Sequence, residues 1–211
     1  MAGPVKKRPY ASPARHARAE ATRARIIDAA TRLFLGEGYG RTSTAAIGRE
    51  AQTSEASVFA VFGSKADLLV AVVTDHVTRD ADFPLHDRPV WRTLAAEPDK
   101  TPAIEAFARV VRRAHDRSWR LLAVAAAAAQ DDPAVAEAVG RAADRRHATC
   151  TWFVRDVIGV AKLDRTRRAD AVWALTSVEN YRHLVVERAW PPKDYESWLS
   201  GLLSLALHPG T

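Results

Sequence analysis

The sequence predicts an all-helical protein in which a small N-terminal helical domain precedes a larger helical domain. Apolar residues recur at helical spacing along almost the whole chain, and no stretch has the apolar–polar alternation of a half-buried strand. Two short segments that begin at capping serines are separated by Gln52 and Thr53 alone. With 211 residues, 47% of them hydrophobic, the chain can build one large domain or two small ones.

Basic residues concentrate at the N-terminus. Residues 1–26 hold seven Lys and Arg side chains against Glu20, and the rest of the chain is balanced, so this segment carries the whole net charge of +6. We expect residues 1–17 to form a flexible basic arm. Such an arm indicates a polyanionic partner that is met at one end of the molecule. The alternative is a solvated tail that keeps the protein soluble.

We expect residues 18–63 to form a three-helix domain. Its first helix begins at Ser12-Pro13 or at Thr22 and ends near Gly36 and Gly38. The other two helices are expected over 44–51 and 55–61, capped by Ser43 and Ser54. Since only two residues join them, they must turn sharply against each other, which is the spacing of a helix-turn-helix.

Residues 64–211 are expected to form the second domain. Its first helix, over 64–80, is capped by Ser64 and links the two domains, and a proline-rich loop with a short helix follows over 82–101. Later helices are expected over 101–130, with a break near Asp116-Arg117, and over 132–160, 164–190 and 191–207.

Several classes of protein are excluded by what the sequence lacks. Cys150 is the single cysteine, which rules out an internal disulfide and suits a reducing cytosol, so we expect a cytoplasmic protein. No apolar run approaches the ~18 residues of a spanning helix, so no membrane partner is expected. The seven histidines have no metal-ligand spacing, and no phosphate loop or nucleophile elbow occurs. We therefore expect no metal, no cofactor and no catalytic residues.

Both ends of the chain resemble the tetracycline-repressor (TetR) family. The similarity lies in ARIIDAATRLFLGEGYGRTSTAAIGREAQTSEASVFAVFGSKADLL and in RRADAVWALTSVENYRHLVVERAWPPKDYESWLSGLLSLAL. The resemblance implies a ligand-responsive repressor that binds double-stranded, pseudo-palindromic operator DNA as a homodimer, through an N-terminal helix-turn-helix. It also implies that the C-terminal helices dimerise and enclose a small-molecule effector. The alternatives are a ligand- or protein-binding module of the same fold that has lost operator binding, and an enzyme.

The third helix departs from the family pattern. Gln52 stands where the family has a turn glycine, and a positive φ there would cost about 1 kcal/mol. Phe59 replaces a tyrosine that reaches a phosphate, and Val61 replaces a histidine or tyrosine, whereas Lys65 is retained. In a helix that begins after Ser54, the core side carries Val58 and Phe62. The remaining side is apolar and has one acidic residue, which predicts a weak reader that depends on the arm for affinity.

The expected DNA contacts come from the arm, the start of the second helix, the outer side of the third helix and the lysine after it. The arm supplies phosphate or minor-groove contacts, and Glu55, Ser57 and the apolar side chains meet base edges. The predicted residues are Lys6, Lys7, Arg8, Arg41, Thr42, Ser43, Thr44, Ser54, Glu55, Ala56, Ser57, Phe59, Ala60 and Lys65.

The second domain offers an aromatic-rich set that could line a cavity for an apolar or aromatic effector. Each of these aromatic side chains could equally be ordinary core. The predicted lining is Phe107, Val111, His115, Trp119, Leu122, His147, Trp152, Phe153, Trp173, Thr176, Asn180 and Tyr181. The predicted dimer interface is Leu184, Val185, Trp198, Leu199, Leu202 and Leu203.

Overall fold

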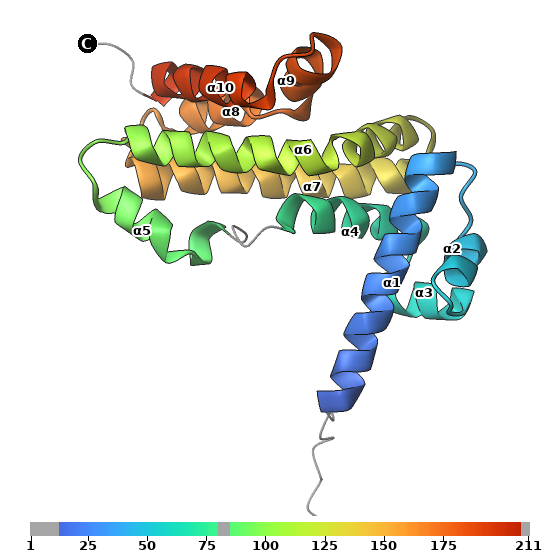
Figure 1. Ribbon diagram of the computed structural model, residues 1–211. Coiled ribbons are helices and arrows are strands. Elements are labelled where there is room, and N and C mark those ends of the chain that lie inside the picture. Colours follow the sequence, from blue (N-terminus) through green and yellow to red (C-terminus); the bar gives the residue numbers. More distant parts are fainter. Residues whose placement is uncertain (1–12, 80–84, 208–211) are drawn as a thin grey trace, which may run out of the picture.

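The computed structural model describes residues 13–79 and 85–207, and the helices are arranged in layers (Figure 1). Two long antiparallel helices, α6 (Thr101–Asp131) and α7 (Pro133–Trp152), form the middle layer. One side of this layer is covered by α8 (Arg165–Leu175) and α10 (Pro192–Leu207), and the other by α4 (Lys65–Thr78). Within the described ranges every regular element is a helix or helical turn, as the sequence predicts.

The N-terminal domain is a helix-turn-helix. It consists of α1 (Pro13–Glu37), α2 (Thr44–Glu50) and α3 (Glu55–Phe62). The first helix begins at Pro13, the earlier of the two predicted starts, so residues 13–17 are helical and do not belong to a flexible arm. Residues 1–12, with the rest of that arm, lie outside the described part of the chain.

The expected caps position α2 and α3. Ser43 Oγ accepts a hydrogen bond from the backbone N–H of Ala46, and Ser54 Oγ accepts one from Ser57. Gln52 has φ of 52°, so the residue at the family's glycine position does adopt the left-handed conformation. The two helices meet closely at Gly48, where a Cβ would lie 3.1 Å from the Glu55 backbone nitrogen.

The middle of the chain differs from the expected pattern in one place. A 3-10 turn, η1 (Leu85–Asp87), and a short helix, α5 (Pro89–Ala96), occupy the predicted loop region. The predicted break near Asp116-Arg117 is absent, because α6 runs without interruption. Helical spacing of buried residues continues across this pair, from Ala114 and His115 to Ser118 and Leu121.

The helix expected over 164–190 is divided. After α8, Thr176 and Ser177 interrupt the chain before α9 (Val178–Tyr181) and the π-helical turn η3 (Arg182–Glu187). Asn180 closes the interruption, because its Nδ2 donates to the carbonyls of Ala174 and Leu175. A second π-helical turn, η2 (Phe153–Ile158), extends α7.

Two buried clusters organise the molecule. The first unites the core of the N-terminal domain with Leu121 and Ala125 of α6 and Val135 of α7. The second lies among α5, α6, η2, α8 and α10 and is rich in aromatic residues. The N-terminal domain therefore rests directly on the end of the α6–α7 pair, and its core is continuous with that of its neighbour.

One further property concerns apolar helices. Within the described ranges, no single helix is long and apolar enough to cross a membrane. Taken together, α3 and α4, which meet at an angle of 68°, are long and apolar enough by length and composition alone.

Candidate nucleic-acid interface and effector domain

The outward side of α3 is open to solvent. Glu55, Ala56, Phe59 and Ala60 are exposed, and Phe59 keeps 45% of its surface accessible. Val58 is buried in the N-terminal core, as expected. An exposed phenylalanine between two alanines, on a short capped helix, provides an apolar strip that can meet thymine methyl groups.

Several polar groups predicted to contact DNA are already used inside the domain. The hydroxyl of Thr42 is buried and donates to the carbonyl of Gly38 at 2.8 Å, so this side chain is not available to DNA. Thr44 is also buried, and its hydroxyl donates to the carboxylate of Glu55. Ser57 shares a 2.8 Å hydrogen bond with Ser54. In this group the exposed side chains are those of Arg41, Ser43 and Ser54.

Lys65 has a structural role that the sequence did not indicate. Its ammonium donates to the carbonyls of Tyr39 at 3.0 Å and Thr42 at 3.1 Å. It also lies 4.0 Å from the centroid of the Tyr39 ring. Burial lowers the pKa of Lys65, although the negative charge of Asp132 opposes this. An ammonium has three N–H donors, and these two hydrogen bonds use two of them. A contact between the third donor and a DNA phosphate stays a prediction.

The first part of α1 forms a basic extension. Its exposed side chains include Arg15, His16 and Arg18. In Figure 1 this part of α1 projects past α2 and α3, away from α6 and α7. The helix is anchored only further along, where Arg23 lies over the Phe62 ring at 5.2 Å and Arg25 donates to the carbonyl of Ala51 at 3.2 Å. The predicted contacts of Lys6, Lys7 and Arg8 lie outside the described residues.

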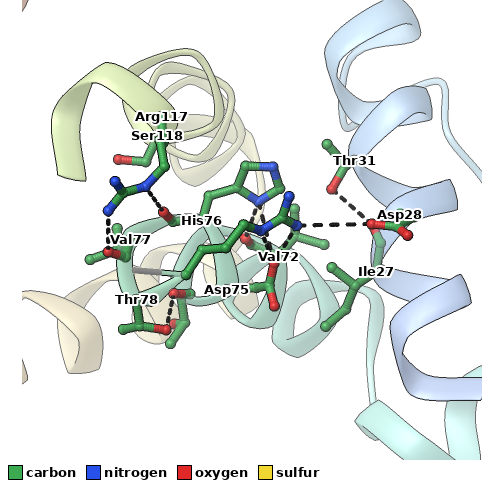
Figure 2. A network of polar contacts seen from close by, with 12 residues as sticks. Ile27, Asp28, Thr31, Val72, Asp75, His76, Val77, Thr78, Arg117 and Ser118 are labelled. Carbon is green, nitrogen blue, oxygen red and sulfur yellow. Dashed lines mark hydrogen bonds and ion pairs between the residues drawn. The ribbon is translucent and has the colours of Figure 1, made fainter. Parts of the chain in front are cut away.

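A polar network joins α4 to both domains (Figure 2). Arg117 of α6 donates to the carbonyls of His76 at 3.0 Å and Val77 at 3.2 Å, at the C-terminal end of α4. On the other side, Arg79 donates to Asp75 and lies 3.9 Å from Asp28 of α1. These contacts connect the two domains through α4.

The residues predicted to line an effector cavity do not converge on one. Phe107 and Phe153 are buried and stack with ring centroids 4.0 Å apart, and Tyr181 is buried against Tyr195. Val111 and Trp152 pack against this same core. In this structure these side chains belong to the core, and their part in an effector cavity stays a prediction. Asn180 and Thr176 serve the interruption between α8 and α9 through backbone hydrogen bonds.

Two surface pockets among the described residues of this domain bear on the predicted effector site. The first, of about 510 Å³, is open to solvent and has a mixed polar and apolar lining from α7 and η2, which includes Asp144, His147, Trp152 and Arg155. The second is a groove of about 330 Å³ between α6 and α9. It is mainly apolar and is lined by Trp119, Leu122, Ala123, Ala126, Ala127, Gln130, Val178, Glu179 and Arg182. Trp173 belongs to neither, since it lies half-exposed beneath Arg146.

His115 is buried as a neutral side chain. Its Nε2 donates to the carbonyl of Thr176 at 3.2 Å, and its Nδ1 has no hydrogen-bond partner among the described residues. Burial lowers the pKa of His115 to about 4, with the nearby Arg146 acting in the same direction. The imidazole is therefore uncharged at neutral pH, with its proton on Nε2.

The predicted dimer residues separate into buried and accessible sets. Leu199 and Leu203 are fully buried inside the protomer, so they are not available to a partner. Trp198 and Leu202 are partly exposed, and Leu205 retains 72% of its surface. These last three lie at positions i, i+4 and i+7 of α10 and share one face of the helix. Leu184 and Val185, in η3, are also partly exposed.

Comparison with known proteins identifies the N-terminal domain. Residues 26–72 match the family model of the bacterial regulatory proteins of the tetR family. A segment of 55 residues is 40% identical to the uncharacterised helix-turn-helix transcriptional regulator YvkB of Bacillus subtilis. This match covers 26% of the chain and 29% of YvkB, so it spans less than a third of that relative's length.

Solved structures share the fold along nearly the whole chain. A protein described as a TetR-family regulator from Mesorhizobium loti has a TM-score of 0.68 at 18% identity, over 90% of this chain and 96% of its own. NalD, the secondary repressor of the MexAB-OprM multidrug efflux pump in Pseudomonas aeruginosa, has a TM-score of 0.59 at 21% identity, over 87% and 95%. The multidrug binding protein EbrR, complexed with imidazole, has a TM-score of 0.56 at 20% identity, over 99% and 98%. At these identities the likeness establishes the fold.

Proposed function

We propose that this chain is a cytoplasmic, ligand-responsive transcriptional repressor of the TetR family. The match of residues 26–72 to the family model and the fold shared with a TetR-family regulator support this. The protein binds a pseudo-palindromic operator as a homodimer. The observation that carries this proposal is the exposed face of α3 on a capped helix-turn-helix. The family that residues 26–72 match consists of regulatory proteins, so this match gives no support to the enzyme alternative.

Two sources of binding free energy are proposed. The strip Ala56, Phe59 and Ala60 reads base edges, while affinity comes from cations beside it. Arg15 and Arg18 of the basic extension can follow the phosphate backbone, as can Arg41 at the start of α2. Lys6, Lys7 and Arg8 add to the same charge. A basic extension next to an apolar reading helix explains how a helix with no basic residue of its own holds DNA.

The dimer is proposed to form through α10. The exposed stripe Trp198, Leu202 and Leu205 is the apolar surface that supports this. A single eight-residue reading helix contacts few bases, so two copies related by a two-fold axis are needed to select one operator.

The effector is proposed to be an apolar or aromatic small molecule that occupies the groove between α6 and α9. Trp119 and Leu122 supply its apolar wall, and Glu179 and Arg182 supply polar groups at the rim. Among solved structures of this fold are a repressor and a multidrug binding protein, which supports a small-molecule effector.

Selection of DNA tests the proposal. The full-length protein is incubated with a random duplex library, bound duplexes are amplified, and the enriched sequences are read. We expect a pseudo-palindrome with half-sites about one helical turn apart. An Ala60→Glu variant, which adds a negative charge to the exposed face of α3, should enrich nothing. Recovery of the random input by the wild-type protein would contradict the proposal.

A further inference from the structure

The two domains are joined by a polar contact at the edge of their shared core. Tyr39 lies in the loop between α1 and α2, and Asp132 lies between α6 and α7. The Tyr39 hydroxyl donates to Oδ2 of Asp132 at 3.0 Å across 93 residues of sequence. We propose that this pair is a latch through which the α6–α7 turn sets the orientation of the DNA-reading helix. The inference rests on the proposed function.

Asp132 is held firmly on the side of the effector domain. Its Oδ1 accepts hydrogen bonds from the backbone N–H groups of Ala134 at 2.9 Å and Val135 at 3.4 Å, as the N-cap of α7. One carboxylate thus serves two partners, with Oδ1 fixed to the helix start and Oδ2 to Tyr39. A movement of the first turn of α7 carries the partner of Tyr39 with it.

Tyr39 is held equally firmly on the side of the reading domain. The residue is buried, with 8% of its surface exposed, and its ring has the Phe34 ring at 5.8 Å and the Lys65 ammonium above it. Lys65 donates hydrogen bonds to the carbonyls of both Tyr39 and Thr42, so it stabilises the loop that ends at the Ser43 cap. The side chains of Thr44 and Glu55 then tie the start of α2 to the start of α3.

The charge states support a persistent contact. The hydrogen bond from Tyr39 lowers the pKa of Asp132, while burial and the neighbouring carboxylate raise that of Tyr39. The carboxylate is therefore ionised and the phenol protonated around neutral pH, which makes a charge-assisted hydrogen bond. The groove between α6 and α9 extends to Gln130, two residues before Asp132, so a molecule in the groove lies close along α6 to the latch.

Hydrogen exchange on the full chain, free of DNA, tests the latch. Tyr39→Phe removes only the hydroxyl, and Asp132→Ser keeps a capping side chain that is too short to reach Tyr39. Asp131→Asn, at the exposed neighbouring position, is the matched control. We expect both latch variants to speed amide exchange in residues 38–62 by roughly fivefold and to leave residues 140–207 unchanged. The control should exchange as the wild type does.

The double variant separates a latch from two independent contacts. Each single substitution already breaks the same hydrogen bond. In the double variant Tyr39→Phe with Asp132→Ser, amide exchange in residues 38–62 should therefore be no faster than in the faster of the two single variants. Unchanged exchange in 38–62, or an equal increase along the whole chain, would overturn the latch. Failure to select any DNA would instead remove the proposed function, and the exchange result would still decide whether the two domains are latched.

Discussion

Arg117 of α6 donates from its Nε to the backbone carbonyl of His76 at 3.0 Å, so a side chain of the effector domain caps the C-terminal end of α4 (Figure 2). The last carbonyls of a helix have no partner within the helix, and here a guanidinium satisfies two of them. Since α4 also packs against α1 and α3, this cap fixes the helix that lies between the two domains.

The first prediction follows from that cap. Arg117→Met keeps much of the side chain's apolar length but removes the hydrogen bonds to His76 and Val77, leaving the carbonyls to solvent. We expect the free energy of unfolding to fall by about 1–2 kcal/mol in urea denaturation. Arg92→Met, on the exposed side of α5, is the control and should change it by less than about 0.5 kcal/mol. Equal stability of the two variants would show that the cap contributes nothing.

The second prediction concerns the basic extension of α1. Arg15→Gln with Arg18→Gln removes two exposed charges per protomer without touching the core. If each arginine meets one phosphate, a dimer loses four contacts, and the slope of log K against log salt should flatten by roughly 3 to 4. Fluorescence anisotropy on a selected duplex measures the slope. Arg92→Gln with Arg167→Gln removes equal charge from the effector domain and should leave the slope unchanged.

The third prediction concerns assembly. Leu205→Asp puts a charge on the exposed stripe of α10, where it disturbs no core contact of the protomer. We expect it to convert a wild-type dimer into a folded monomer in sedimentation velocity at micromolar concentration. Leu163→Asp, at a site that is 97% exposed but lies outside the stripe, should stay dimeric. A wild-type protein that sediments as a monomer would refute the α10 interface.

The fourth prediction is a pH dependence due to His115. Its folded pKa of about 4 lies below the unfolded value, so the unfolded chain binds the proton more readily. The stabilisation is present above the unfolded pKa of about 6.5 and is lost as the pH falls from there towards 4. From pH 7.5 to pH 5 this one group should cost about 2 kcal/mol.

The check compares wild-type protein with His115→Phe, which keeps a planar ring and removes the titration. The difference in stability between pH 7.5 and pH 5 should be smaller in the variant. Leu163→Phe, at a site that is 97% exposed, is the control and should retain the wild-type difference. The same pH dependence in His115→Phe and in the wild type would mean that His115 titrates normally in the folded protein.

Local signals in the sequence predicted much of the fold. The capping serines at 43, 54 and 64, and Asp132-Pro133, mark helix starts that the structure confirms. These signals work because a cap acts on backbone groups within three residues. The break near Asp116-Arg117 was a wrong prediction, since the buried face of α6 continues across this pair from Ala114 and His115 to Ser118 and Leu121.

Contacts distant in sequence could not be predicted in the same way. Asp132 was interpreted as a cap alone, yet its second oxygen bonds Tyr39 from the other domain. Lys65 was expected at a phosphate, and its hydrogen bonds to two carbonyls of the loop before α2 were not predicted. Helical spacing likewise assigned Leu199 and Leu203 to an interface, because period alone does not say whether an apolar face meets its own protomer or a partner.

Binding to selected operator DNA tests the central claim, that the apolar outer face of α3 reads DNA. Fluorescence anisotropy is measured with the enriched duplex and with a shuffled duplex of equal length, for wild type, Ala60→Glu and the control Ala96→Glu on α5. Wild type and control should bind the enriched duplex at least about a thousandfold more tightly than the shuffled one. Ala60→Glu should lose that preference. Equal binding of both duplexes by the wild type, or an unchanged preference in Ala60→Glu, would contradict the claim.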